Sequence, residues 1–228
     1  MSLTLTAIFW AAVTLAIYAG ARRLSAWRCR WWTSPLLVTW GLCGLLIVAL
    51  QANYATYLSG THWLVALLGP ATISFAIPIH RNRTTIRRHW AILAVGVTAG
   101  CALAVGSAWC LATFLDLPPQ LRASLVPRSI TTPLAMASAA QLGGVPELTA
   151  TFTAITGLFG AAVGDLLVAV LPLRTSFARG ALFGMGAHGA GVARAREIGP
   201  EEGAIAGLIM ILAGLTTVVG VSLFASLR

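Results

Sequence analysis

Eight apolar runs follow one another along the chain, separated by short polar connections. A helix of about 20 residues crosses the roughly 30 Å hydrocarbon layer of a bilayer, so most of these runs are long enough to span it. The pattern predicts an all-α polytopic membrane protein with about seven or eight transmembrane or re-entrant helices, some discontinuous, and a possible inverted repeat. The runs cover residues 3–20, 35–51, 63–79, 90–115, 123–142, 148–173, 178–193 and 203–227.

The short connections leave no room for a soluble domain, so we expect residues 1–228 to form a single integral membrane domain. Arginines follow the first run instead of preceding it, which predicts an uncleaved first span with its N-terminus outside. We divide the chain into a first span with a basic loop (1–34), a first helix triad (35–115), an interrupted segment (116–147) and a second helix triad (148–228).

Composition and charge agree with a membrane protein. Hydrophobic residues make up 58% of the chain and charged residues 9%, whereas about a quarter of the residues in a soluble domain are charged. The net charge of +9 comes from arginines at the ends of apolar runs, a pattern typical of cytoplasmic loops and not of a nucleic-acid-binding surface. We therefore expect a multi-pass membrane protein. The two densest clusters are Arg22, Arg23, Arg28 and Arg30, and Arg81, Arg83, Arg87 and Arg88.

Charge also predicts part of the topology. The connection 51–62 has no formal charge, so runs 35–51 and 63–79 should form a hairpin whose tip faces outside. Segment 123–142 is ambiguous: if it crosses, ten arginines lie inside and four outside, and if it is re-entrant, eleven lie inside and three outside, with Arg128 set aside. Both routes stay open. The re-entrant route would invert the triad at 148–227 relative to that at 35–115.

The segment PRSITTPLAM, which begins at Pro127, places an arginine among prolines and hydroxyls inside an apolar run. Thr132 and Pro133 are a helix-start signal, because threonine caps free amides and proline suits the first helical position. The exposed amides and the Arg128 guanidinium favour a small anion such as a carboxylate, with Ser129, Thr131 and Thr132 as neutral donors. The alternative is a proline kink with Arg128 reaching to the interface.

Two further interruptions are candidates for the same site. Gly69 and Pro70 break the run 63–79, and Thr72 follows within a turn; short or broken apolar segments in both halves of a membrane chain indicate a transport site, although ordinary kinks explain them equally well. His188 stands among Gly180, Gly184, Gly186, Gly189 and Gly191.

His188 could bind substrate, carry a coupling proton or be a packing residue. Asp165, inside the run 148–173, is the second proton-coupling candidate and could pair with Arg128, with Arg179 or with a cation. We interpret Glu197, beside Arg194, as one partner of a solvated loop pair.

Other chemistries have little support. The four cysteines show no C-x-x-C spacing and no nearby histidine at metal-site spacing, so we predict neither a metal site nor a redox pair. We find no nucleophile elbow, phosphate loop or metalloprotease motif, and therefore expect no catalytic residues, no enzymatic activity and no cofactor.

Several motifs together resemble the LrgB family, also called CidB-like autolysis modulators, over about residues 34–227. They are YATYLSGTHWLVALLGPATISFAIPIHR at 54–81, SLVPRSITTPLAMASAAQLGGVPELTA at 124–150 and GMGAHGAGVARAREIG at 184–199. The resemblance implies a multi-pass integral protein of the bacterial inner (plasma) membrane. It also implies that the protein works with a small LrgA- or CidA-like membrane protein to control murein hydrolase activity and lysis. A holin and antiholin analogy is the usual description of that family.

The resemblance also implies a second mechanism. A plant plastid relative moves glycolate and glycerate, and bacterial members are connected to pyruvate and related acids. We therefore expect a homo-oligomeric transporter of small monocarboxylates of the pyruvate, glycolate, lactate or acetate type, linked to control of autolysis; the alternative is a holin-like pore or scaffold. The chain departs from the family at Arg128, where lysine is usual, and at residues 187–192, where the family motif S-H-A-I-G-T is replaced by A-H-G-A-G-V and both hydroxyls are lost. A bidentate guanidinium suits a carboxylate but can change which acid fits.

Overall fold

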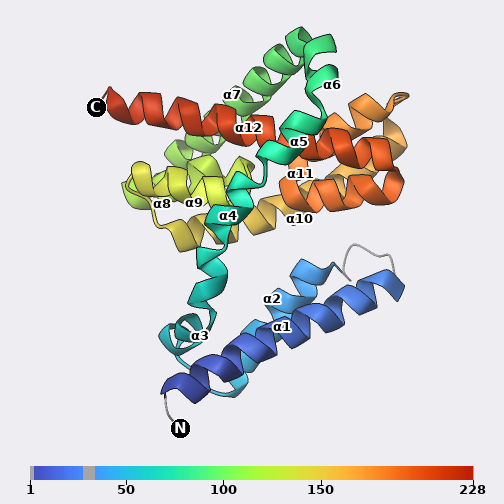
Figure 1. The fold of residues 1–228 in the computed structure, drawn as a ribbon. Coiled ribbons are helices and arrows are strands. Elements are labelled where there is room, and N and C mark those ends of the chain that lie inside the picture. The colour runs from blue at the N-terminus through green and yellow to red at the C-terminus, as the bar shows by residue number, and fades with distance from the viewer. Residues whose placement is uncertain (1–2, 28–33, 228) are drawn as a thin grey trace. The chain divides into compact units, whose positions relative to one another are not determined.

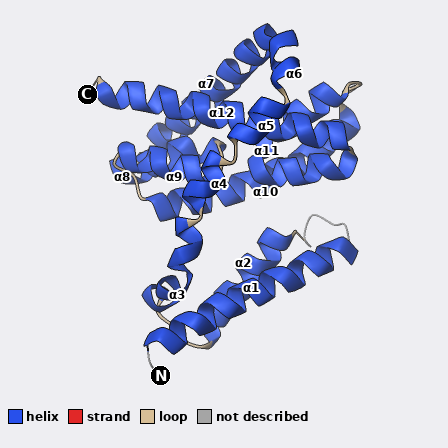
Figure 2. Cartoon of the chain, in the orientation of Figure 1, coloured by secondary structure: helices blue, strands red, loops and turns tan. Residues whose placement is uncertain are grey.

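The computed structural model describes residues 3–27 and 34–227, and within these ranges the chain consists of helices and short connections without a strand (Figures 1 and 2). The chain separates into two compact units, Met1–Pro70 and Ala71–Arg228. Arg28, Cys29 and Arg30 of the predicted basic loop lie outside the described residues.

The first unit is built on one long helix. Helices α2 (Pro35–Ala49) and α3 (Tyr54–Ala66) both pack against α1 (Leu3–Trp27). The contact between α1 and α3 includes the rings of Trp10 and Tyr57, whose centroids are 5.4 Å apart in an edge-on arrangement. The connection between α2 and α3 covers residues 50–53, whereas the sequence predicted residues 51–62, because α3 begins at Tyr54 inside the predicted connection.

Prolines break the predicted run 63–79 into separate helices. Pro70 has no N–H to donate to the carbonyl of Ala66, where α3 ends, and Pro78 has none for Ser74, just before α5 begins. The sequence predicted an interruption at Gly69 and Pro70, and the helix stops just before them. The resulting short helices are α4 (Leu68–Ile73), α5 (Ala76–Arg81) and α6 (Arg83–Arg88).

The second unit contains α7 (Trp90–Phe114), α8 (Pro119–Leu125), the 3-10 turn η2 (Val126–Ser129), α9 (Thr132–Gln141), α10 (Pro146–Val170), α11 (Ser176–Ile198) and α12 (Pro200–Ser226). Among the described residues, four helices are long and apolar enough to cross a membrane: α1 from Leu5, α7, α10 and α12. Helix α2 is apolar but shorter. The eight apolar runs are therefore not eight continuous spans, because the runs 63–79, 123–142 and 178–193 are broken.

The segment from α8 to α9 is a hairpin, which we name the first hairpin. Its two ends meet, because the N–H of Val145 donates to Ser124 Oγ (2.7 Å) and a methyl group on Gly144 would lie 2.7 Å from Ser124 N. The chain enters along α8, turns at Ile130 and Thr131, where the backbone is extended, and returns along α9. Segment 123–142 thus folds back on itself, which is the geometry expected of the re-entrant route.

Helix α11 is also a hairpin, because its backbone reverses at His188 (φ 46°, ψ −124°). Phe183, before the break, lies 2.6 Å from the position of a methyl group on Gly164. Arg194, after the break, donates from Nε to Asp165 Oδ1 (2.7 Å). Since two adjacent residues of α10 contact the two halves of α11, the halves lie side by side (Figure 1). We name residues 176–198 the second hairpin, with limbs 176–187 and 189–198.

Helix α10 runs past both hairpins and fixes their order. Thr149 donates to the carbonyl of Ser124 at the base of the first hairpin (2.9 Å). Thr156 contacts Arg128 near the tip of that hairpin, and the next residue, Gly157, faces the tip of the second. Beyond Gly157, α10 packs against the limbs of the second hairpin. The hairpins therefore enter from opposite ends of α10 and their tips meet near its middle.

Helix α12 shows the same order. Its first two turns contact both limbs of the second hairpin. Further along, a methyl group on Gly214 would lie 2.6 Å from Leu134 in the first hairpin, and Ser222 donates to the side chain of Gln141 at the end of α9 (3.2 Å). Two long helices thus flank the point where the tips meet.

Helix α7 runs parallel to α12, because Leu93 and Cys101 share a buried cluster with Ile205 and Ala213. The pair formed by α7 and the first hairpin therefore runs opposite to the pair formed by α10 and the second hairpin. This opposed arrangement resembles an inverted repeat. It relates residues 90–141 to residues 146–198, whereas the sequence suggested two longer triads.

Replacement of Gly160 by alanine should destabilise the protein. Gly160 packs against the carbonyl oxygen of Gly186, so an added methyl group overlaps the backbone of the second hairpin. We expect overpacking to cost about 1–3 kcal/mol, measured by thermal unfolding of the purified protein in detergent. Gly186→Ala is the matched control, since a methyl group there meets no atom within 4 Å. Equal stability of Gly160→Ala and the unmodified protein would contradict this packing.

Cysteine accessibility should separate the two hairpins. In a variant lacking the four natural cysteines, single cysteines at Gln120 and Gln141 should react with a membrane-impermeant reagent from the same side. Cysteines at Thr175 and Arg196 should both react from the other side. If Gln120 and Gln141 react from opposite sides, the segment crosses and the first hairpin is wrong.

Candidate functional site

The tips of the two hairpins form the candidate site. His188 of the second hairpin lies beside the backbone of Ser129 and within electrostatic range of Arg128, both at the tip of the first. Helix α10 closes one side with Thr156 and Gly157, where a methyl group would lie 3.2 Å from the carbonyl oxygen of Ala187. The absence of a side chain at Gly157 lets the second hairpin reach the first.

Arg128 is half-buried and has a neutral partner. Its Nη1 donates to Thr156 Oγ1 at 3.2 Å. The ion pairs of the described residues join other arginines, Arg179 and Arg194, to carboxylates. A guanidinium in a partly desolvated position without a carboxylate carries an uncompensated positive charge, which a bound anion would balance.

Two helix starts converge on the same place. Helix α9 begins at Thr132, and the second limb of the second hairpin begins at Gly189. The first amides of a helix have no partner within it and carry the positive end of its dipole. Because the hairpins approach from opposite directions, both positive ends point toward Arg128 and His188.

The cap of α9 differs from the prediction. The sequence predicted Thr132 as the cap and Pro133 as the first helical residue, but the cap residue is Thr131, and Pro133 occupies the second helical position. The extended backbone of Ile130 and Thr131 ends at Thr131, so the helix begins at Thr132, one residue earlier than predicted. The Thr131 side chain makes no capping hydrogen bond, so the amides of the first turn keep no side-chain acceptor from it.

His188 is 3% exposed, and neither of its ring nitrogens has a hydrogen-bond partner of ordinary geometry in the described chain. A buried polar group without a partner is costly, and such groups in native proteins commonly face a ligand or water. Its positive φ is also unusual for a residue other than glycine. Both features single out the tip of the second hairpin.

Asp165 lies away from the tips. It accepts two hydrogen bonds from Nε of Arg194 (2.7 and 3.0 Å), whose Nη1 also donates to Glu197 (2.6 Å). Asp165 is nine residues beyond Thr156, or about 13 Å along the helix. Of the partners that the sequence left open for Asp165, neither Arg128 nor Arg179 holds it; Arg179 lies 3.9 Å from Glu202. Glu197 forms a surface pair with Arg194, as expected, but both residues lie in the second limb of α11 and not in a loop.

Gly69, Pro70 and Thr72 lie in the short helix α4, which contains the junction between the two units. Their part in binding stays a prediction. Thr131, Ser129 and Arg128 lie together in the turn of the first hairpin, and His188 is brought to them from the second.

The sequence reasoning missed Thr156, the partner of Arg128. A polar residue beside Gly157 inside the apolar run 148–173 was the available signal. The glycines around His188 predicted an irregular helix, but they gave no sign that the chain would return to the end from which it entered.

The described residues contain no group of three or more histidine, cysteine or acidic side chains that could hold a metal ion. The groups that meet at the hairpin tips are a guanidinium, hydroxyls, an imidazole and backbone amides, and together they can bind an anion.

Comparison with known proteins identifies the family of this chain. Residues 14–227 match the model of the LrgB-like family. Two relatives from Bacillus subtilis (strain 168) are YwbG, 36% identical over 205 residues that cover 90% of this chain and 91% of YwbG, and YxaC, 33% identical over 165 residues that cover 72% of each chain. No solved structure matches the chain. With its long apolar helices and this match along nearly its whole length, the chain is a membrane protein that belongs to the LrgB-like family.

Proposed function

We propose that this protein transports small monocarboxylate anions across the membrane and binds them where the two hairpin tips meet. The observation that carries the proposal is Arg128, a half-buried cation without a carboxylate partner among the described residues, placed where two helix starts converge. Arg128 and the amides of α9 would hold the carboxylate. Ser129, Thr131 and His188 would contact its hydroxyl or carbonyl group.

The charge distribution supports an orientation. Of the described arginines in the second unit, eight lie toward the Val170 end of α10 and one, Arg122, lies toward the Pro146 end, with Arg128 set aside between them. Arginine excess marks the cytoplasmic side. We therefore place the second hairpin on the cytoplasmic side and the first on the outer side. Each tip would then separate the bound anion from one of the two solutions, which is the arrangement that alternating access needs.

Uptake into proteoliposomes tests the proposal. The purified protein should take up pyruvate, glycolate, lactate or acetate in a saturable manner, with competition between these acids. Loss of a hydrogen bond to a charged group costs about 1.5–3 kcal/mol, so Arg128→Gln should weaken binding roughly 10- to 150-fold. Arg174→Gln is the control, because Arg174 is an exposed arginine between α10 and α11.

Two results would overturn the proposal of a carrier. One is no saturable uptake of any of the four acids, and the other is an unchanged affinity of Arg128→Gln for them. Passage of unrelated ions and dyes according to size would instead favour the holin-like pore that acts with an LrgA- or CidA-like partner.

Proton coupling distinguishes His188 from Asp165. If His188 carries the proton, His188→Gln should abolish stimulation of uptake by a proton gradient and leave exchange of one acid for another. Asp165→Asn should lower stability by about 1 kcal/mol, since its half-exposed pair with Arg194 is lost. Adding Arg194→Gln should recover part of that loss and leave the proton dependence unchanged. Loss of proton stimulation in the Asp165→Asn, Arg194→Gln double variant would assign coupling to Asp165 instead.

A further inference from the structure

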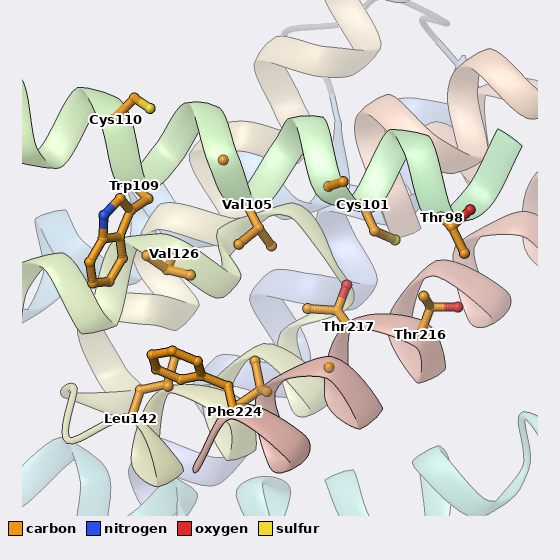
Figure 3. Close-up of a pocket in the computed structure, with 14 residues that line it drawn as sticks. Thr98, Cys101, Val105, Trp109, Cys110, Val126, Leu142, Thr216, Thr217 and Phe224 are labelled. Carbon is orange, nitrogen blue, oxygen red and sulfur yellow. The ribbon is translucent and has the colours of Figure 1, made fainter. Parts of the chain in front are cut away.

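A cavity of about 540 Å³ lies between α7 and α12, on the outer face of the first hairpin (Figure 3). Val105 and Trp109 of α7 form one wall, and Val221 and Phe224 of α12 form the other. The outer face of the first hairpin closes the base with Val126. We name this cavity the α7–α12 groove.

The α7–α12 groove is apolar and open along one edge. Most lining atoms belong to carbon. Of the polar lining groups, the Thr98 hydroxyl donates to the carbonyl of Ala94 (2.6 Å), and the Cys101 thiol donates to that of Ala213 (3.5 Å). The Thr217 hydroxyl has no hydrogen-bond partner of ordinary geometry among the described residues and lies at the buried base beside Cys101. The exposed side chains of Trp109 and Phe224 stand at the open edge.

The length of the groove matches one leaflet of a bilayer. Its α7 wall runs from Thr98 to Cys110, which is about 18 Å at 1.5 Å per residue. Half of a hydrocarbon layer of about 30 Å is roughly 15 Å. Both walls belong to helices long and apolar enough to cross the membrane, so the groove runs from the middle of the layer to the Pro146 end of the unit. This is the length and direction of one acyl chain.

A positive charge stands at the outer end of the groove. The guanidinium of Arg122 lies over the ring of Trp109, 5.4 Å from its centroid, and Arg122 is one turn before Val126 of the groove base. Its Nη2 donates to the carbonyl of Leu117 (3.4 Å), and the ion pairs of the described residues do not include it. A cation beside the end of an apolar groove complements a phosphate headgroup.

We propose that the α7–α12 groove binds one phospholipid, with an acyl chain between the two helices and an anionic headgroup at Arg122. The chain supplies most of the affinity through burial of methylene groups, and Arg122 supplies the preference for negative charge. The lipid lies against Val126, in the turn that leads to Arg128. This inference does not depend on the identity of the transported anion.

Glycines in the groove allow a direct test. A methyl group added at Gly106 or Gly220, both in the groove, meets no atom within 4 Å, so the larger side chains of Gly106→Leu with Gly220→Leu should extend into the groove and fill it. Gly96→Leu is the matched control, because Gly96 lies in the same helix with equally open surroundings but does not line the groove.

The full chain is placed in nanodiscs of equal parts phosphatidylglycerol and phosphatidylethanolamine, and retained lipid is measured by native mass spectrometry. We expect one retained lipid, mostly phosphatidylglycerol. Displacing even two methylenes lowers occupancy about tenfold, so the filled double variant should lose at least that much. Arg122→Gln should keep the lipid and lose about fivefold of the headgroup preference. Gly96→Leu and Arg174→Gln should match the unmodified protein.

The proposal is wrong if the unmodified protein retains no more lipid than the filled variant, or if filling changes the oligomeric state instead of the lipid, since the occupant would then be protein. Should the filled variant fail to fold, photoactivatable phosphatidylglycerol gives a second measurement on the unmodified chain. A reactive group at the acyl terminus should label the stretch from Thr98 to Val105 or that from Thr216 to Gly220. Labelling confined to other helices would overturn the assignment.

Discussion

The interior of a bilayer offers no water to backbone amides and carbonyls, so a helix can be interrupted there only where protein or a ligand meets the freed groups. Two of the interruptions in the second unit, at Ile130 to Thr131 and at His188, are brought together by the fold. The long helices α10 and α12 pass on either side, and each contacts both hairpins in the same order. The positions of Arg128, Ser129, Thr131 and His188 follow from this meeting of two breaks.

The two hairpins are held by different interactions. Hydroxyl hydrogen bonds fix the base of the first, where Ser124 joins Val145 and Thr149. The limbs of the second are held to α10 by close packing at Gly164 and, near its surface end, by the charge pair of Asp165 with Arg194. Charges lie toward the solvent end and neutral contacts lie deeper, as the cost of burying ions requires. Arg128 is the exception, and it is the residue for which a ligand is proposed.

Much of this organisation could be predicted from the sequence, because apolar runs and prolines act locally. The boundaries of α2, α7 and α12 lie within a few residues of the predicted runs, and Pro70, Pro78 and Pro133 mark real interruptions. Local patterns could not predict the direction in which the chain continues after an interruption. The run 178–193 has the composition of a span, yet its chain turns back at a single residue, and that reversal depends on glycine contacts with α10 and α12 that are distant in sequence. For the same reason, the partners of Arg128 and Asp165 were not predictable: Thr156 and Arg194 are each nearly 30 residues away.

The helix–hairpin pairs 90–141 and 146–198 run in opposite directions, which is the relation that a half-turn about an axis in the membrane plane would give. Within these two pairs, the path of the backbone does not distinguish one face of the bilayer from the other. The asymmetry comes from α12, which has no counterpart in the pairs, and from side chains. Arg128 stands in one tip and His188 in the other, and arginines crowd one rim and not the other.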